Sequence, residues 1–155
     1  MAENIKVNKA TGDEVYVEGE NFTQKSDVVI NENSKVQTVP SGKTWVLQFL
    51  TIKYISEAGG SARQLAIEIG DGTNLLWPKN FGATQAGGLT RNYYAASDLP
   101  DDNAFDSDGR IRMQLEAHVL PAGYTVKVYD VDNRDATDDM ELRLIVDERN
   151  AGAML

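Results

Sequence analysis

Two clusters of carboxylates have the residue types and the spacing that could bind a cation. The first runs from Asp98 to Asp108 and contains no Lys or Arg, and the second runs from Asp130 to Glu141 around a single base, Arg134. Calcium takes about six to eight oxygen ligands, which clustered aspartates can supply. The candidate calcium ligands in the second cluster are four aspartates, Asp130, Asp132, Asp135 and Asp138.

The second cluster nevertheless departs from a calcium-binding loop in three respects. Arg134 stands in its middle, no glycine provides a sharp bend, and no glutamate stands at the twelfth position as a bidentate ligand. These departures favour solvated acidic turns, in which Asp138 and Asp139 cap or end a strand. We therefore expect no cofactor, and calcium is the alternative.

His118 is the only histidine, and Glu116 lies two residues before it on the polar face of an expected strand. Such a pair could act as a general base. No nucleophile motif of the Gly-x-Ser-x-Gly kind accompanies it. The tetrapeptide at 41–44 ends like a phosphate-binding loop, but Gln37 replaces the required glycine and a strand is expected to follow. We therefore expect a solvated His118 and no enzyme.

Several aromatic side chains fall near expected loops or weak strands. Exposed aromatic rings can stack on sugars or anchor protein interfaces. Most of this group is expected to lie in the core or in subunit contacts, and a carbohydrate platform is the alternative. The group consists of Trp77, Phe81, Tyr93, Tyr94 and Phe105.

The composition excludes several classes of protein. The chain has 155 residues, no cysteine and a formal net charge of −9. Without cysteine there is no disulfide, thiol nucleophile or thiolate zinc site. The acidic balance argues against nucleic-acid binding. No apolar run is long enough to span a membrane, and the acidic start indicates no secretory signal. The two carboxylate clusters carry −5 each, which leaves a nearly neutral body.

Apolar residues recur with a period of two, which is typical of half-buried strands. The long segment 44–55 is apolar on both faces, which indicates a central strand. Strands that recur about every ten residues predict an all-β fold, an antiparallel β-sandwich or jelly roll over residues 36–149. The expected strands cover residues 44–55, 65–69, 75–77, 90–96, 110–119, 124–129 and 139–148.

Turn residues separate these strands. Residues 58–61 and 70–73 are glycine-rich and are expected to form hairpin turns. Residues 39–42 and 120–123 share a Pro-x-Gly pattern that suits a type I turn with proline in its second position. Each of these two turns leads into a strand, as in a sandwich with two related halves.

The two ends of the chain differ from the body. Residues 1–35 are more polar and hold two short β-like pieces, at 15–17 and 28–30, so we expect an N-terminal extended arm or edge hairpin. Residues 150–155 form a short apolar tail. Both ends are candidate contacts with partner proteins. The candidate contact residues are Val15, Tyr16, Val17, Phe22, Met154 and Leu155.

Three segments carry a resemblance to a known family: VPSGKTWVL at 39–47, LPAGYTVKVYD at 120–130 and DDMELRLIVDER at 138–149. Together they resemble jelly-roll capsid decoration (cement) proteins of tailed bacteriophages. The resemblance covers residues 36–149. It implies a non-enzymatic structural protein that is made in the host cytoplasm and binds the outer surface of the virion. Such a protein is a homodimer or homotrimer that bridges subunits of the major capsid protein.

On this interpretation the acidic loops face outward and the N-terminal arm faces the capsid. The alternative is a glycan-binding jelly-roll module, with or without a dependence on calcium, on a phage tail or another appendage of the virion.

Overall fold

The computed structural model describes residues 5–7, 14–16, 22–30, 32–116, 118–132 and 137–151. All regular structure in these residues is β-strand, which confirms the all-β expectation. None of the described residues forms a helix that could cross a membrane. The strands are β1 (Ile5–Val7), β2 (Glu14–Tyr16), β3 (Phe22–Asp27), β4 (Ser34–Thr38), β5 (Lys43–Ile55), β6 (Leu65–Gly70), β7 (Leu75–Asn80), β8 (Thr90–Ala96), β9 (Arg110–Gln114), β10 (Val119–Leu120), β11 (Thr125–Asp130) and β12 (Asp139–Asn150).

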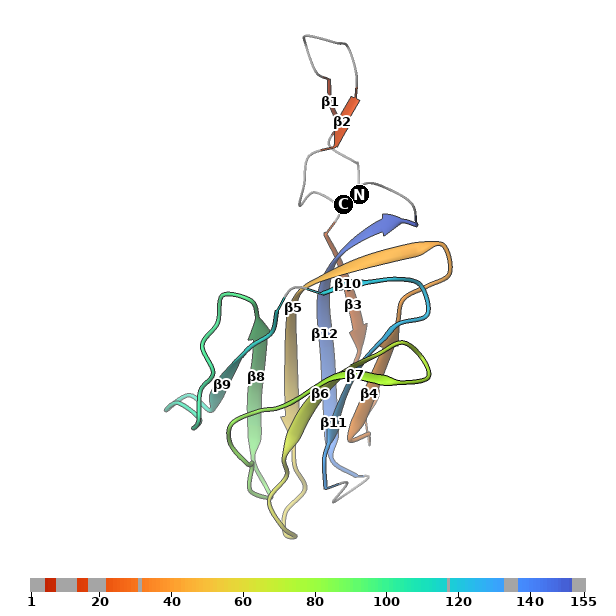
Figure 1. Ribbon diagram of the computed structural model, residues 1–155. Helices are drawn as coiled ribbons and strands as arrows, with labels where there is room; N and C mark the ends of the chain where they lie inside the picture. The colour runs from red at the N-terminus through yellow and green to blue at the C-terminus, as the bar shows by residue number, and fades with distance from the viewer. Residues whose placement is uncertain are drawn as a thin grey trace.

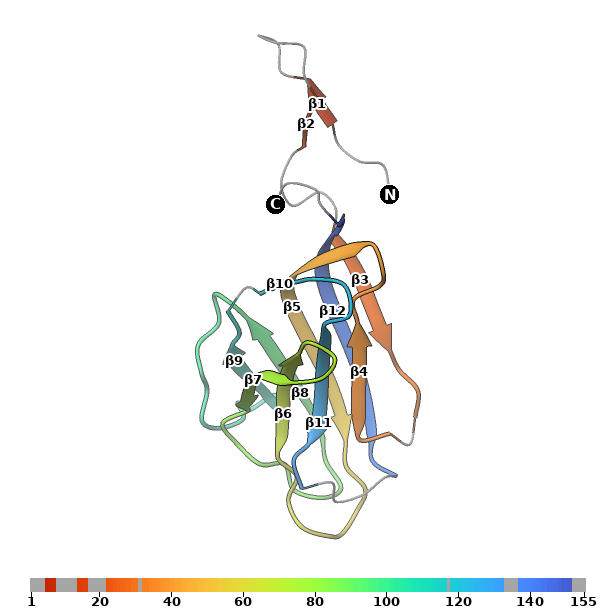
Figure 2. The ribbon, with the colours of Figure 1, turned by 45° about the vertical axis from the view of Figure 1, so that its right-hand side comes forward.

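Two sheets lie face to face and form the expected β-sandwich (Figures 1 and 2). The larger sheet has the order β3-β12-β5-β8-β9, and β10 pairs with the start of β5. The smaller sheet has the order β4-β11-β6-β7. Strands β1 and β2 pair with each other as a separate two-stranded sheet. Every pairing is antiparallel except that between β8 and β9, which is parallel.

Strands β5 and β12 form the centre of the larger sheet. They are the longest strands, with 13 and 12 residues, and they pair from Ile55 with Asp139 to Lys43 with Asn150. Strand β5 also pairs with β8 and β10, so the central strand predicted at 44–55 is confirmed.

Alternating side chains of both sheets fill the space between them. The larger sheet contributes Leu50 and Leu142, and the smaller sheet contributes Ile67 and Val126, all fully buried. Burial of such a side chain stabilises the fold by about 1.5–3 kcal/mol relative to exposure. The sandwich therefore has one continuous apolar core, as the period-two pattern predicts.

The strand predicted at 110–119 is wrong in its second half. Strand β9 ends at Gln114, and the chain then crosses to β10, which pairs with Trp45 and Val46 of β5. Leu115 and Leu120 are both buried. Side chains five residues apart point to opposite faces of a continuous strand, so burying both leucines requires the strand to break.

The N-terminal part of the sandwich also differs from the prediction. Residues 28–30 form an exposed loop, and the polar segments on either side of it form β3 and β4. Strand β3 lies at the edge of the larger sheet and β4 at the edge of the smaller one. The boundary predicted after residue 35 thus falls within β4.

The two Pro-x-Gly turns lie side by side. The amide of Lys43 donates to the carbonyl of Pro40, and that of Tyr124 donates to the carbonyl of Pro121, so each proline holds the first position and not the second. The glycine of each turn has a positive φ. Val39 connects the turns, because its amide donates to Tyr124 and its carbonyl accepts from Gly123.

One of the two glycine-rich turns forms the predicted hairpin. Residues 70–73 lie in the turn that joins the paired strands β6 and β7. Residues 58–61 instead belong to a crossover from β5 in the larger sheet to β6 in the smaller sheet, so the predicted hairpin there is wrong. The Arg63 guanidinium fills this crossover and donates to the carbonyls of Gly59 and Ser61.

A buried ion pair fixes the crossover to the start of β12. Arg63 donates Nε to Oδ2 of Asp138 at 2.9 Å and Nη2 to Oδ1 at 3.1 Å, and both residues are almost completely buried. The Tyr54 hydroxyl and the Glu57 amide also donate to Asp138, each at 2.7 Å. Burial and the neighbouring Asp138 raise the pKa of Tyr54. Asp138 thus joins β5, the crossover and β12.

The Asp138→Asn variant is expected to lower the free energy of unfolding by about 3–5 kcal/mol, because it leaves the buried Arg63 charge without its counter-ion. Denaturant unfolding of both proteins measures this loss. Asp98→Asn removes an exposed carboxylate and serves as the control, with a change within about 0.5 kcal/mol. Equal stability of the two variants would contradict the structural role of the ion pair.

Candidate functional site

The described candidate calcium ligands, Asp130, Asp132 and Asp138, do not form a group that could hold a metal ion. Asp138 is engaged by Arg63, and Asp130 is buried where its Oδ1 accepts from the amides of Gln64 and Asp132, each at 3.2 Å. Asp135 lies outside the described residues. Within the described part of the chain, no three His, Asp or Glu side chains form a group that could hold a metal ion. The two buried aspartates therefore fix loops.

His118 is half-buried, and it does not lie on the polar face of a strand as predicted. It lies in the crossover between β9 and β10, where its ring meets the edge of Trp77 with the centroids 5.3 Å apart. Its Nε2 is buried and has no hydrogen-bond partner among the described residues. Burial lowers the pKa of His118, and the nearby Glu116 partly opposes this effect. The imidazole thus packs against the indole ring of Trp77.

Most of the aromatic group lies in or against the core, as expected. Phe81 and Tyr93 are buried and Phe105 packs on the core. The ring of Tyr93 stands edge-to-face with those of Phe81 and Phe105, at centroid distances of 4.9 and 5.4 Å. Tyr94 packs beside Phe49. Phe81 and Tyr93 are therefore not available to a carbohydrate platform.

The first carboxylate cluster caps the edge of β9. This strand ends the larger sheet and would otherwise present backbone N–H groups on the side away from β8. Three alternate amides donate to carboxylates of the loop 97–109 at 2.9–3.0 Å. The pairs are Arg110 with Asp106, Arg112 with Asp102 and Gln114 with Asp101.

The bases around this loop largely neutralise it. Lys79 of β7 pairs with Asp101 at 2.7 Å, Arg112 pairs with Asp102 at 2.8 Å, and Arg110 pairs with Asp106 at 3.0 Å. Hydrogen bonds from Lys79 and Arg112 lower the pKa values of Asp101 and Asp102, respectively. The loop that appears unbalanced in the sequence is therefore an ion-paired edge cap.

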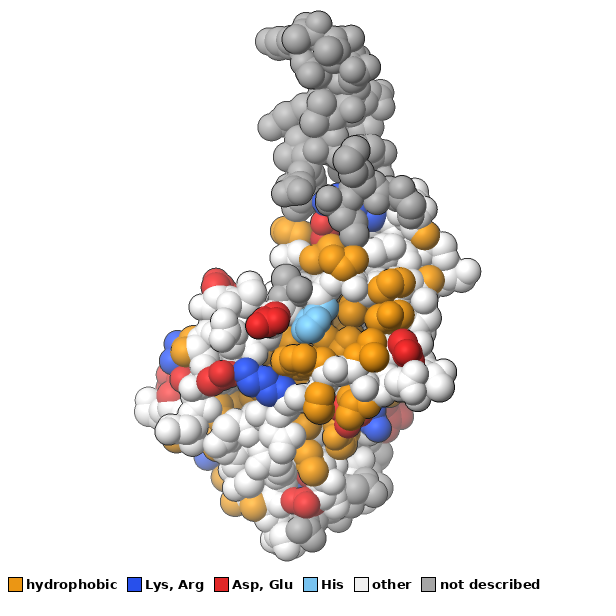
Figure 3. Space-filling view, in the orientation of Figure 1, with side chains coloured by type: hydrophobic (Ala, Val, Ile, Leu, Met, Phe, Trp, Pro, Cys, Tyr) orange, Lys and Arg blue, Asp and Glu red, His pale blue; other side chains and the backbone are white. Residues whose placement is uncertain are grey.

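An apolar patch lies between β7 and β10. It consists of Leu76 and Val119, which are 51% and 54% exposed, together with the half-buried Trp77 and His118. In the space-filling view, hydrophobic side chains gather around the histidine (Figure 3). Contiguous exposed apolar surface marks an interaction site more often than scattered single residues do. The apolar patch is the candidate functional site.

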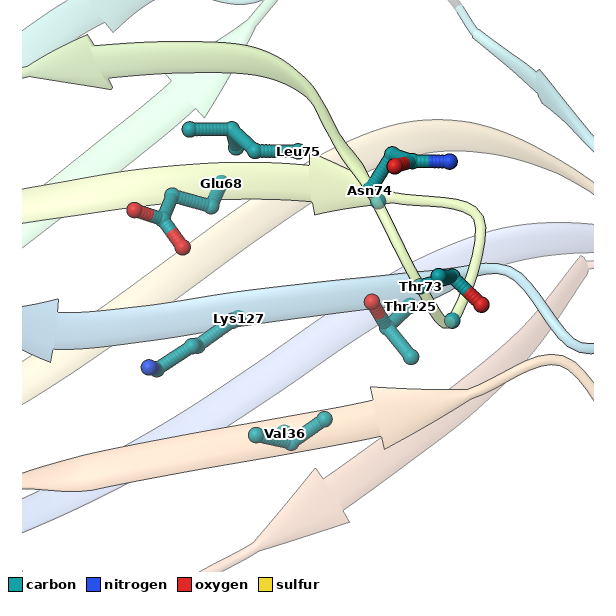
Figure 4. A pocket seen from close by; sticks show the side chains of 9 residues that line it. Val36, Glu68, Thr73, Asn74, Leu75, Thr125 and Lys127 are labelled. Carbon is teal, nitrogen blue, oxygen red and sulfur yellow. The ribbon is translucent and has the colours of Figure 1, made fainter.

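A shallow pocket lies on the outer face of the smaller sheet (Figure 4). Its volume is about 350 Å³. Val36 and Leu75 form apolar walls, and Lys127 contributes a basic group. Gly70 allows the carbonyl of Asn74 to approach closely, since a Cβ there would lie 2.9 Å from that oxygen.

Six residues were predicted to contact a partner protein, and Phe22 is the one whose side chain the structure describes. It lies on β3 and is 45% exposed. Val15 and Tyr16 belong to β2, of which the backbone pairing with β1 is described. The remaining contacts fall outside the described residues, so their role stays a prediction. These remaining residues are Val17, Met154 and Leu155.

Comparisons with known proteins give little further information. No family model matches the sequence, and no curated protein matches it either. A comparison of structures finds a chain from the structure of infectious bursal disease virus, Gx strain, with a TM-score of 0.33 and 8% sequence identity. The alignment covers 97% of this chain and 37% of the viral chain. A similarity at this level carries no argument about function.

The edge cap predicts a pH-dependent effect of Asp102→Asn. The pKa of Asp102 lies below its usual value of 3.8 in the folded protein, so its ion pair stabilises the fold above that pH. We expect the variant to melt below the wild type at neutral pH. This difference should vanish as the pH falls through the folded pKa, because protonation then removes the same charge.

Melting temperatures of both proteins from pH 7 to about pH 2 measure the effect. Asp98→Asn is the control, since no described contact ties that exposed carboxylate to β9. A melting difference that stays constant across this range would show that Asp102 stabilises the edge by some other means than its charge.

Proposed function

We propose that this chain is a non-enzymatic structural protein of a bacteriophage virion, which binds the outer surface of the capsid and bridges subunits of the major capsid protein. Two lines of argument support the proposal. The segments at 39–47, 120–130 and 138–149 resemble capsid decoration proteins, and the structure is the β-sandwich that this resemblance implies. The location on the virion follows from the same resemblance.

The same proposal holds that the chain is not an enzyme. Among the described residues, the polar groups best suited to chemistry make contacts that stabilise the fold. Asp138 accepts a hydrogen bond from Arg63, and the ring of His118 packs against that of Trp77. No nucleophile lies within the contacts described for His118. A general base needs a substrate proton within hydrogen-bond reach, and the Nε2 of His118 is buried.

The apolar patch is the observation that carries the proposal. Leu76 and Val119 remain 51% and 54% exposed in the folded chain. Covering such a side chain at an interface is favourable by about 25 cal/mol per Å² of apolar surface. A capsid presents the same surface many times, so weak contacts of one patch gain strength through avidity.

The arm is a second contact within this proposal. Residues 1–21 precede the first strand that pairs with the sandwich, and a paired hairpin of three-residue strands is at best marginally stable by itself. Docking on a neighbouring protein would supply the stability it lacks. Removal of residues 1–21 leaves β3 and β4 intact, whereas removal of residues 1–35 would delete β3 and part of β4.

No specific observation favours the glycan-binding alternative. That function needs exposed aromatic rings and, in its calcium-dependent form, free carboxylates. Phe81 and Tyr93 are buried, and Asp138 is occupied by an arginine. We therefore propose the capsid-binding role alone.

Replacement of the patch should weaken binding to capsids. Purified protein is sedimented with empty capsids of the phage that encodes it, and the bound fraction is measured. Three proteins are compared: the wild type, the double variant Leu76→Asp/Val119→Asp, and the protein without residues 1–21. We expect the double variant to lose at least about tenfold in affinity, because two charges would be buried in the contact. The truncated protein should bind more weakly as well.

Val131→Asp is the matched control, since it places the same charge at another exposed apolar position. Wild-type binding by the double variant would contradict the patch as the contact. Failure of the wild type to bind any capsid would contradict the proposed function as a whole.

A further inference from the structure

The crossover between β9 and β10 holds a buried nitrogen without a hydrogen-bond partner among the described residues. This atom is Nε2 of His118, the only histidine of the chain. In a neutral imidazole one of the two nitrogens carries no proton. The Nε2 atom can therefore be buried as a bare lone pair while Nδ1 keeps the proton. The neutral ring is compatible with this place in the fold.

The protonated ring is not compatible with the same place. An imidazolium carries a proton on both nitrogens, so the N–H at Nε2 would be buried without an acceptor. A buried donor without a partner is costly, and more so when the group is charged. Burial accordingly lowers the pKa of His118 from its usual value of 6.5.

The charges around the ring do not compensate for its burial. Glu116, on the same crossover, raises the pKa of His118, but this effect is smaller than that of burial, and the Glu116 side chain is exposed. Lys79 lies two residues after Trp77 on β7, and its ammonium pairs with Asp101. The positions of β5 that pair with β10 or donate to the crossover carry no charge. These positions are Trp45, Val46 and Leu47.

A short segment attaches the crossover to the larger sheet. The carbonyl of His118 accepts from the amide of Leu47 at 3.1 Å, and β10, with two residues, pairs with the start of β5. Segments with few backbone hydrogen bonds open locally at a low free energy. Opening of this segment would expose the imidazole to water, together with the half-buried Trp77 and the buried Leu120.

We propose that protonation of His118 opens this crossover and releases β10 from β5, so that the chain carries an acid-sensitive latch over Trp77. The open form binds the proton with the ordinary pKa of histidine, and the closed form binds it with a lower one. The closed form is therefore fully favoured above pH 6.5, and it loses stability relative to the open form as the pH falls from 6.5 toward the lowered pKa. The inference concerns the free chain and does not depend on capsid binding.

Proton NMR of the free protein tests the first step. Because the chain has one histidine, a single imidazole Cε1 proton signal reports its titration. We expect a pKa of His118 below 6.5. A pKa at or above 6.5 would overturn the proposal, since protonation would then favour the closed form or leave it unaffected.

Hydrogen–deuterium exchange of the free protein tests the opening itself. The protection factor of the Leu47 amide compares its exchange with that of an unfolded chain at the same pH. We expect this factor to fall by about threefold or more between about pH 7.5 and about pH 5. Amides of β12 that pair with β3 should keep their protection, because the opening is local.

His118→Phe is the matched variant, since it keeps a ring against Trp77 and cannot be protonated. Its Leu47 amide should be equally protected at both pH values. Asp98→Asn removes an exposed carboxylate, keeps His118 and should behave like the wild type. Melting temperatures establish that each variant is folded, and His118→Gln replaces His118→Phe if that variant is not.

Two further results would overturn the proposal. One is a wild-type Leu47 amide whose protection is the same at both pH values, since the crossover would then stay closed in acid. The other is an equal loss of protection in the wild type and in His118→Phe, since this would assign the acid effect to other titrating groups.

Discussion

Each open β-sheet ends in two edge strands that can pair with another chain, and the protection of these edges is the constraint that organises this molecule. On one side of the sandwich, carboxylates cap the amides of β9, Pro78 removes one amide from β7, and Lys79 ties the two edges together. On the other side, Lys35 fixes the loop that leads from β3 to β4. The carboxylates and Lys79 thus close the edges of β9 and β7, while the side chain of Leu76 on β7 remains exposed.

The charge of −9 has a structural use. Asp138 neutralises a buried arginine that holds the crossover between the sheets, and Asp130 ties the end of β11 to Gln64. Asp101 and Asp102 receive edge amides and pair with bases of β7 and β9. Because these carboxylates are engaged within the chain, the apolar surfaces are the more informative guide to its partners.

The parts of the fold that the sequence predicts are those governed by local alternation. Strands β11 and β12 alternate and β5 is apolar on both faces, and their positions follow from these patterns. Strands β3 and β4 are polar edge strands, and their hydrogen-bonded partners rather than their side chains determine them.

The parts of the site that the sequence does not predict depend on distant residues. Arg63 and Asp138 are 75 positions apart, so no local pattern indicates their ion pair. The position of His118 follows from the break between Leu115 and Leu120, a spacing that alternation alone could have revealed. The aspartates of the edge cap lie 4, 10 and 13 positions before the amides that they accept from, so they meet these amides because the loop 97–109 folds back along β9.

The central claim is that this sandwich meets its partner through the apolar patch and not through the acidic loop. Hydrogen–deuterium exchange of the protein, free and bound to capsids, tests this most directly. The account predicts slower exchange on binding in β7 and β10 and unchanged exchange in the loop 97–109. Protection confined to the loop 97–109, with β7 and β10 unchanged, would contradict it.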